Sequence, residues 1–157
     1  MTLPGISEET ATSLVSVLQR HLAAHIDLAL TFKHVHWNVV GPNFIAVHEM
    51  LDPWADAALA AADATAERIA ALGGAPQGTC EQVAYRKSWG AYSLGVAPVE
   101  QHLNALEAYL APIVEALRGD LHDFVNEHDV VWAGPLSEHV ATLDQYLWFI
   151  RAHSGAR

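Results

Sequence analysis

Apolar residues recur at helical spacing in four long segments of the chain, which glycine and proline separate. The apolar stripe of the first segment is Leu14, Leu18, Leu22, Ile26 and Leu30. One face of an amphipathic helix produces this kind of repeat. Ser7 stands before two glutamates, so this helix has a capping hydroxyl and acidic residues at its positive end. We expect it to run from about residue 7 to residue 40 and to stop at Gly41-Pro42.

The same pattern predicts three further long helices. The second runs from about Asn43 to Leu72, where the sequence Gly-Gly-Ala-Pro ends it. The third has Pro98 at its first position, and the fourth opens at Gly134-Pro135 and reaches about His153. Their apolar stripes are Val99, Leu103, Leu106 and Leu110 in the third helix, and Leu136, Val140, Leu143, Leu147 and Ile150 in the fourth.

The second and third helices are joined by a long irregular connection, residues 73–97, with a short helix expected within residues 81–89. No segment alternates with period two over a useful length. The expected fold is therefore all-α, with residues 1–157 forming a single four-helix bundle. The long second-to-third crossover is the connection pattern of ferritin-like bundles. Pro53 and Pro112 fall inside expected helices, and Pro53 should kink the second helix because it removes a backbone N–H.

Composition narrows the functional classes. The 8 basic and 18 acidic residues give a net charge of −10, and only two of the basic residues are lysines, so the cluster needed to bind phosphates is absent. Acidic chains are often merely well solvated, but an acidic shell also attracts cations. No apolar run reaches the roughly 18–20 residues of a membrane span, and the amino terminus does not resemble a signal peptide. Cys80 stands alone, which favours a reducing cytoplasm over a disulfide framework.

Five residues make up a candidate metal-ligand set, four of them on the second helix: His36, His48, Asp52, Asp63 and Glu67. At about 100° per residue, positions 48, 52, 63 and 67 fall at roughly 0, 40, 60 and 100°, so they share one helix face. The two pairs are nevertheless roughly 22 Å apart at about 1.5 Å per residue, too far for one metal centre. Two copies of the helix, crossing antiparallel about a twofold axis near residues 57 and 58, would bring the pairs together. If these residues are ligands, the site lies between subunits.

The ligand types point to non-haem iron or zinc, and away from structural zinc, which prefers cysteine clusters. The HExxH pattern of zinc proteases is missing, as are the Glu-x-x-His pairs of ordinary di-iron bundles. A single His or Asp on a helix is usually a surface or core residue. Here, however, the pairs flank a stretch of small, apolar residues that suits a close helix–helix interface: Ala55, Ala57, Ala58, Leu59, Ala60, Ala61 and Ala62. His21 and His25 form another (i, i+4) pair, which could bind metal adventitiously.

The residues resemble the Dps-type mini-ferritins, which are dodecameric bacterial ferroxidases. The shared pattern is HWNVxGPxF, then VHEMLD, then DxxAER followed by LGG, and the YLWFI segment near the other end is also similar. The resemblance covers essentially the whole chain. It implies an iron-storing ferroxidase that typically prefers hydrogen peroxide to O2 and holds a ferric mineral inside twelve subunits built from twofold dimers.

Carried over residue by residue, the resemblance assigns the primary iron to Asp63 and Glu67 of one subunit with His36 of its twofold mate. His48 and Asp52 of that mate would hold, or hydrogen-bond to, a second and weaker position. Trp37 and Trp148 would lie close by and take up stray oxidising equivalents, although ordinary packing explains them equally well. Other divalent metals such as zinc would act as inhibitors or substitutes. Met50 is the only internal methionine, so no haem is expected.

An acidic stretch between the third and fourth helices offers a candidate iron-entry pore: Asp120, Asp123, Glu127 and Asp129. Three copies around a threefold axis would make a negative channel, although a solvated helix end explains the same residues. Family members that bind DNA often use lysine-rich tails. This chain begins acidic and ends without a basic extension, so we expect weak or no direct DNA binding.

Three functions from different classes therefore stand at this stage. The first is a cytoplasmic ferroxidase and iron store that protects the cell from oxidative damage, with association with the nucleoid left open. The second is a structural shell that compacts DNA. The third is a cage that binds metal ions without turnover.

Overall fold

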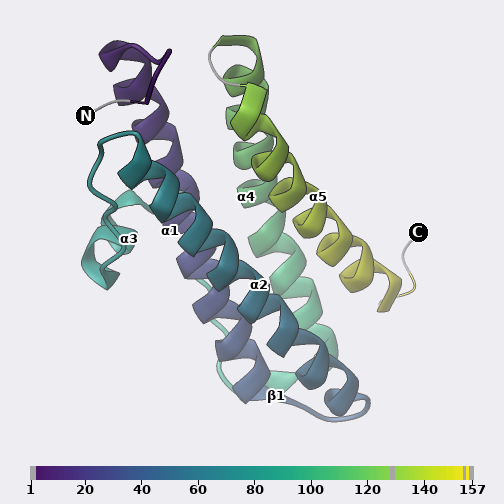
Figure 1. Cartoon of the computed structure of the whole chain (residues 1–157). Coiled ribbons are helices and arrows are strands. Elements are labelled where there is room, and N and C mark those ends of the chain that lie inside the picture. The colour runs from purple at the N-terminus through teal and green to yellow at the C-terminus, as the bar shows by residue number, and fades with distance from the viewer. Residues whose placement is uncertain (1–2, 128–129, 154, 156–157) are drawn as a thin grey trace.

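The computed structural model describes residues 3–127, 130–153 and 155, and the side chains of residues 123–133 lie outside this description. The elements in chain order are α1 (Glu8–Asn38), β1 (Val39–Val40), α2 (Phe44–Ala71), α3 (Cys80–Arg86), β2 (Ala97–Pro98), α4 (Val99–Glu127) and α5 (Val130–His153). Helices α1 and α2 form one antiparallel pair, and α4 and α5 form the other (Figure 1). The crossover that carries α3 returns along α1 from the end of α2 to the start of α4. The predicted four-helix bundle with a short crossover helix is confirmed.

Both ends of α1 follow from local chemistry. At the start, the Ser7 hydroxyl accepts a hydrogen bond from the Thr10 backbone N–H at 3.1 Å, as its capping position predicts. The helix ends at Asn38, two residues earlier than expected, because Val39 and Val40 are extended. They pair in parallel with Ala97 and Pro98, so this short bridge ties the α1–α2 turn to the start of α4.

The apolar stripe predicted for α1 is wrong at its end. Leu14, Leu18 and Leu22 are buried, but Leu30 is 56% exposed. A strict four-residue step advances about 400° per repeat, so it drifts roughly 40° each time and leaves the buried face after a few turns. The buried face continues instead through Leu28, Phe32 and Val35. Neither this helix nor any other within the described ranges is apolar enough to cross a membrane.

Three prolines lie inside helices. The expectation that Gly134-Pro135 opens the last helix is wrong, because α5 already begins at Val130 and holds Pro135 in its second turn. At that position the missing N–H costs one intrahelical bond. Pro53 and Pro112 are exposed and helix continues on both sides of them. Since they lie on a solvent-facing side, water can hydrate the carbonyl that each leaves without a partner.

Aromatic packing joins the two helix pairs at the centre of the bundle. The Trp54 ring of α2 stacks on Tyr146 of α5 with ring centroids 4.1 Å apart, and Phe32 of α1 meets both rings edge-on. Phe32 is fully buried, and Trp54 and Tyr146 are nearly so. These contacts hold α1 and α2 against α5.

A half-buried ion pair anchors the crossover to the bundle. Lys87, just after α3, donates to both carboxylate oxygens of Asp27 in α1 at 3.1 Å, and also to the Tyr109 hydroxyl of α4. The Trp89 indole N–H and the Tyr109 hydroxyl both donate to the same carboxylate. Burial alone would lower the pKa of Lys87, but the bonds to Tyr109 and Asp27 outweigh it and raise that pKa. One carboxylate therefore organises three donors from the crossover and α4.

Candidate metal centre

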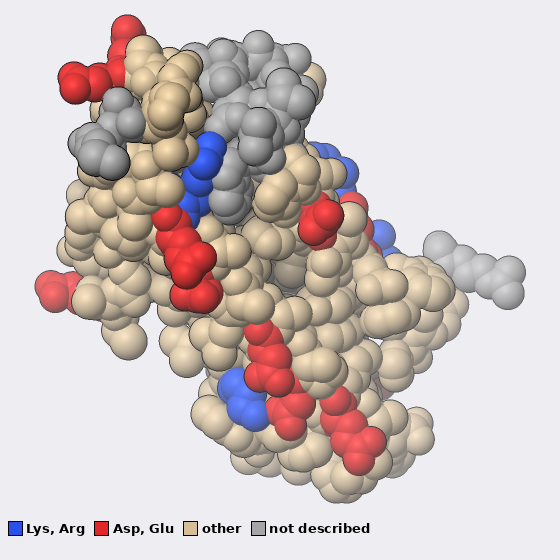
Figure 2. Space-filling view, in the orientation of Figure 1, with Lys and Arg blue, Asp and Glu red and all other residues tan. Residues whose placement is uncertain are grey.

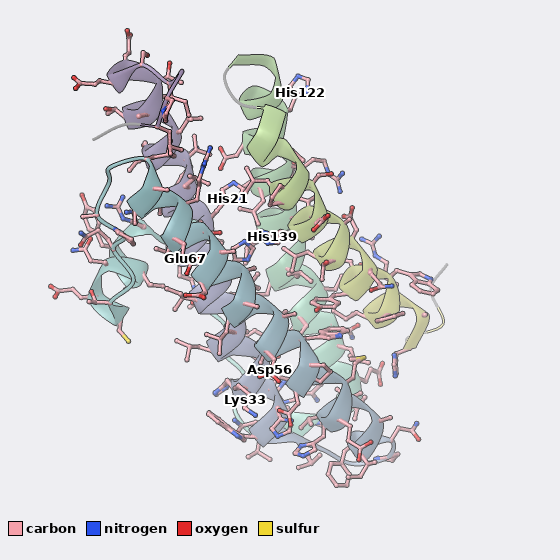
Figure 3. All side chains as sticks on the ribbon, viewed as in Figure 1. His21, Lys33, Asp56, Glu67, His122 and His139 are labelled. Carbon is pink, nitrogen blue, oxygen red and sulfur yellow. The ribbon has the colours of Figure 1, made fainter. Side chains whose placement is uncertain are left out.

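Helix α2 carries the predicted ligands on the face that it turns away from the bundle core. Asp63 and Glu67 are exposed, and His48 and Asp52 are half-buried. Acidic side chains form a diagonal row over this helix (Figure 2), and Glu67 lies on the side of α2 that faces away from α4 and α5 (Figure 3). The sequence-based placement of these residues on one face agrees with their exposure. The fifth candidate, His36 of α1, is 9% exposed.

His36 and His48 hold each other in a fixed orientation. Their rings stack with centroids 3.5 Å apart, and each Nδ1 lies within hydrogen-bond distance of the other residue's backbone carbonyl, at 2.7 and 2.8 Å. A carbonyl can only accept, so each Nδ1 must carry the hydrogen. In the neutral ring the lone pair is then on Nε2, the atom available to a metal. Metal-ligating histidines commonly have their other nitrogen fixed in this way.

Lys33 is the residue of this region that sequence reasoning missed. Its ammonium donates to Asp52 Oδ1 at 2.6 Å and lies over the Trp37 ring, 5.7 Å from the centroid. The same carboxylate oxygen is 3.2 Å from His36 Nδ1. The hydrogen bond from Lys33 holds the pKa of Asp52 below its ordinary value. The available signal was the single lysine one helical turn before His36, but its partner is 19 residues away and on another helix.

We predict that Lys33→Met raises the pKa of Asp52, because the hydrogen bond that lowers it is removed. Since Asp52 has a lowered pKa in the folded protein, its contribution to stability is present above the ordinary carboxyl pKa and is lost as the pH falls through the folded value. Carboxyl NMR titration of the metal-free protein measures the change. Arg118→Met is the control, because Arg118 pairs with Asp144 instead. An Asp52 titration that is the same in both variants would contradict the assignment.

A single subunit groups only part of the candidate set. His36, His48 and Asp52 lie together where α1 meets the start of α2, whereas Asp63 and Glu67 are farther along α2. Within the described part of the chain, no three His, Cys, Asp or Glu side chains are placed to hold one metal ion. One end of α2 thus presents two oriented imidazoles with a carboxylate, and the other end presents two exposed carboxylates.

The remaining predicted residues are less informative. Trp37 and Trp148 are 69% and 61% exposed, and Trp148 packs against its neighbour Phe149. Among the candidate pore residues, Asp120 bonds to Arg20 within the subunit, which partly neutralises it. Asp129 and the side chains of Asp123 and Glu127 lie outside the described residues.

Comparison with known proteins gives consistent matches over nearly the whole chain. Residues 15–156 match the family model of the ferritin-like domain. A DNA protection during starvation protein of Mycolicibacterium smegmatis is 41% identical over 152 residues, which cover 97% of this chain and 82% of that protein. A solved structure of Mycobacterium smegmatis Dps is similar with a TM-score of 0.96 and 40% identity, covering 100% of this chain and 98% of that chain. DpsA14 from Streptomyces coelicolor is similar with a TM-score of 0.93 and 46% identity, covering 97% and 90%.

Proposed function

Because this chain belongs to the Dps family of ferritin-like proteins, we propose that it oxidises Fe²⁺ at sites between subunits and stores the ferric product. Ferroxidase activity and iron storage are supported for the family as a whole. For this chain, the observation that carries the proposal is the split candidate ligand set, with His36 on α1 and the other four residues on α2. His36, His48 and Asp52 are grouped at one end and Asp63 and Glu67 are exposed near the other.

A twofold dimer would complete both halves at once. If two α2 helices cross antiparallel near residues 57 and 58, the histidine end of each helix meets the carboxylate end of the other. Large apolar side chains that are exposed in the single subunit, and that a partner could cover, support this arrangement. Those exposed by 41% or more include Leu30, Trp37, Phe44, Ile45, Leu59 and Trp148. We propose that six such dimers form a hollow dodecamer.

The ligand chemistry suits iron oxidation. Carboxylate oxygens stabilise Fe³⁺ relative to Fe²⁺, and imidazole nitrogen binds both. Asp63 and Glu67 with His36 of the mate would hold the first Fe²⁺, and His48 with Asp52 the second. Two Fe²⁺ each give one electron to hydrogen peroxide, whose O–O bond breaks as two protons are taken up, yielding two water molecules. We propose hydrogen peroxide as the main oxidant, with O2 as a slower one, and Trp37 and Trp148 as nearby sinks for stray oxidising equivalents.

Anaerobic loading with Fe²⁺ followed by stoichiometric peroxide tests this function. We expect a soluble ferric product that elutes with a closed particle of roughly twelve chains, the dodecamer proposed above. The same addition without protein should give a precipitate. Bound Fe²⁺ that peroxide does not oxidise, or ferric product that precipitates as it does without protein, would refute the proposal and favour a cage that binds metal ions without turnover.

A DNA-compacting shell is the weaker alternative. Five of the eight Lys and Arg side chains are bonded to carboxylates within the subunit: Arg20, Lys33, Lys87, Arg118 and Arg151. With a net charge of −10, little positive charge remains to displace counterions from DNA. We therefore propose that protection comes from removing Fe²⁺ and peroxide in the cytoplasm. A gel shift at low salt that showed tight, salt-sensitive binding to duplex DNA would overturn this point.

A further inference from the structure

Three histidines gather inside the bundle, apart from the candidate iron ligands. His21 and His25 lie one turn apart on α1, and His139 comes from α5. His21 and His139 occupy the space between the two helix pairs (Figure 3). The rings of His25 and His139 meet edge-on with centroids 4.9 Å apart, and those of His21 and His25 are 6.4 Å apart. His21 and His25 are 0% and 1% exposed. Imidazoles from two helix pairs are therefore brought together in the interior.

Several ring nitrogens of this cluster are buried without a hydrogen-bond partner in the described part of the chain. They are both nitrogens of His25 and the Nδ1 atoms of His21 and His139. The remaining nitrogen of His21, Nε2, lies 3.3 Å from Asp120 Oδ2; burial alone would raise the pKa of Asp120, but this contact and Arg20 lower it. A buried polar atom left without a partner costs about 1–3 kcal/mol, and native proteins leave few of them. A partner from outside the chain is therefore needed.

A cavity provides the space for such a partner. It has a volume of about 260 Å³ and is lined by His25 and His139, by Thr142 and Tyr146 of α5, and by alanines of α2. The small alanine side chains leave room between α2 and α5. A cavity needs only about 10–15 Å³ of probe-occupied volume to hold a water molecule, so this one can accept an ion together with several waters.

His25 and His139 have the protonation state and the ring spacing that metal ligands need. Burial, and then the neighbouring His139 and His21, hold the pKa of His25 well below its ordinary value. Burial also lowers the pKa of His139. Both shifts favour the neutral ring, the form that binds metal. With Zn–N at about 2.0–2.1 Å, two imidazoles at a tetrahedral angle have ring centres roughly 5 Å apart, close to the 4.9 Å between these two.

We propose that His25 and His139 bind a divalent transition metal of the Zn²⁺ class within each subunit, with water completing its coordination. At 6.4 Å from the His25 ring, the His21 ring is farther away than two imidazoles that share one tetrahedral ion, so His21 is not a ligand of this ion. No three His, Cys, Asp or Glu side chains converge on one point in the described residues, so the ion has two protein ligands. It is therefore held more weakly than a four-ligand structural zinc and can exchange.

Metal binding by the assembled Asp63→Ala/Glu67→Ala protein tests the proposal with the carboxylate half of the candidate iron site removed, and only the metal that is lost with His25 or His139 counts toward it. We expect about one Zn²⁺ per chain by equilibrium dialysis, and a Co²⁺ visible spectrum typical of nitrogen ligands at low coordination number. Adding His139→Gln, or His25→Phe, should remove this equivalent and these bands. His153→Gln is the matched control, because His153 is an exposed histidine on α5, the helix that carries His139. This control should change neither the amount of bound Zn²⁺ nor the Co²⁺ spectrum.

Retention of the Zn²⁺ equivalent in both the His139→Gln and His25→Phe proteins would overturn the proposal. Far-UV circular dichroism shows whether each variant folds. If His25→Phe fails to fold, the less buried His139→Gln decides. The Co²⁺ spectrum of the protein with all histidines intact decides independently, since the absence of these bands also overturns the proposal. Failure of the ferroxidase test leaves this outcome unaffected, because none of the candidate iron ligands takes part.

Discussion

Chains carrying Asp63→Ala and Glu67→Ala should lose peroxide-dependent Fe²⁺ oxidation, and mixing them with His36→Ala/Asp52→Ala chains should restore part of it. Each variant alone lacks one half of every site. In a mixed dimer, one site combines the intact carboxylate end of one chain with the intact histidine end of the other. Random pairing makes half of the dimers mixed, and each has one good site of two. About a quarter of the wild-type activity should therefore return.

The measurement is the initial rate of ferric product formation for each variant and for the co-expressed mixture, normalised to chain concentration. Asp56→Ala is the matched control, because Asp56 is another exposed carboxylate on α2 and is not a candidate ligand. It should keep nearly full activity. If the mixture assembles to the same size and yet stays as inactive as its parents, the sites do not lie between subunits. If the Asp63→Ala/Glu67→Ala protein keeps its full rate, these residues are not the ligands.

Asp27→Ala should strongly destabilise the protein although Asp27 lies outside the candidate metal centre. It leaves Lys87 as a half-buried charge without its carboxylate, and it removes the acceptor of the Trp89 indole. Removing one partner of a buried pair costs about 3–5 kcal/mol. The Asp27 and Lys87 side chains keep 17% and 19% exposure, so we expect the low end, about 3 kcal/mol. For a domain of this size that corresponds to a fall of roughly 6–12 °C in the unfolding midpoint.

Thermal unfolding and hydrogen exchange measure this effect together. In Asp27→Ala, the rate of backbone hydrogen exchange should increase most in the crossover, residues 73–97, because its anchor to α1 and α4 is lost. Asp144→Ala is the control, since Asp144 pairs with Arg118 on the surface with 45% and 57% exposure, and such pairs contribute less than about 1 kcal/mol. Asp27→Asn keeps an acceptor for Trp89 and Tyr109, so its loss of stability should lie between those of Asp27→Ala and Asp144→Ala. An Asp27→Ala protein no less stable than Asp144→Ala would show that the network does not anchor the crossover.

Helix positions could be predicted where the signal lies within a few residues. The Ser7 cap, the break at Gly41-Pro42 and the apolar stripe of α5 are local features, and the structure confirms them. The errors arose where local rules compete with packing. Leu30 continued a regular repeat but drifted off the buried face. Pro135 looked like a helix start, yet α5 extends before it.

The candidate iron site could likewise be predicted only in part from the sequence. Because the helical period is fixed by backbone geometry, the sequence alone determined that positions 48, 52, 63 and 67 share a face of α2 and that one ion cannot join the two pairs. It could not determine the reciprocal bonds of His36 and His48 or the Lys33–Asp52 pair. Those contacts depend on how α1 turns against α2, which is a property of packing.

The inner histidine cluster depends still more on tertiary structure. The sequence determined the His21–His25 pair, since four residues make one turn of helix. Only the fold brings His139, which is 114 positions after His25 in the chain, to 4.9 Å from that ring. The sequence by itself thus determined the helices, the net acidic charge and the split arrangement of the candidate ligands, because each follows from residue type and a fixed helical period. The tertiary structure decided which side chains from different helices meet, because long-range contacts depend on the packing of the whole bundle.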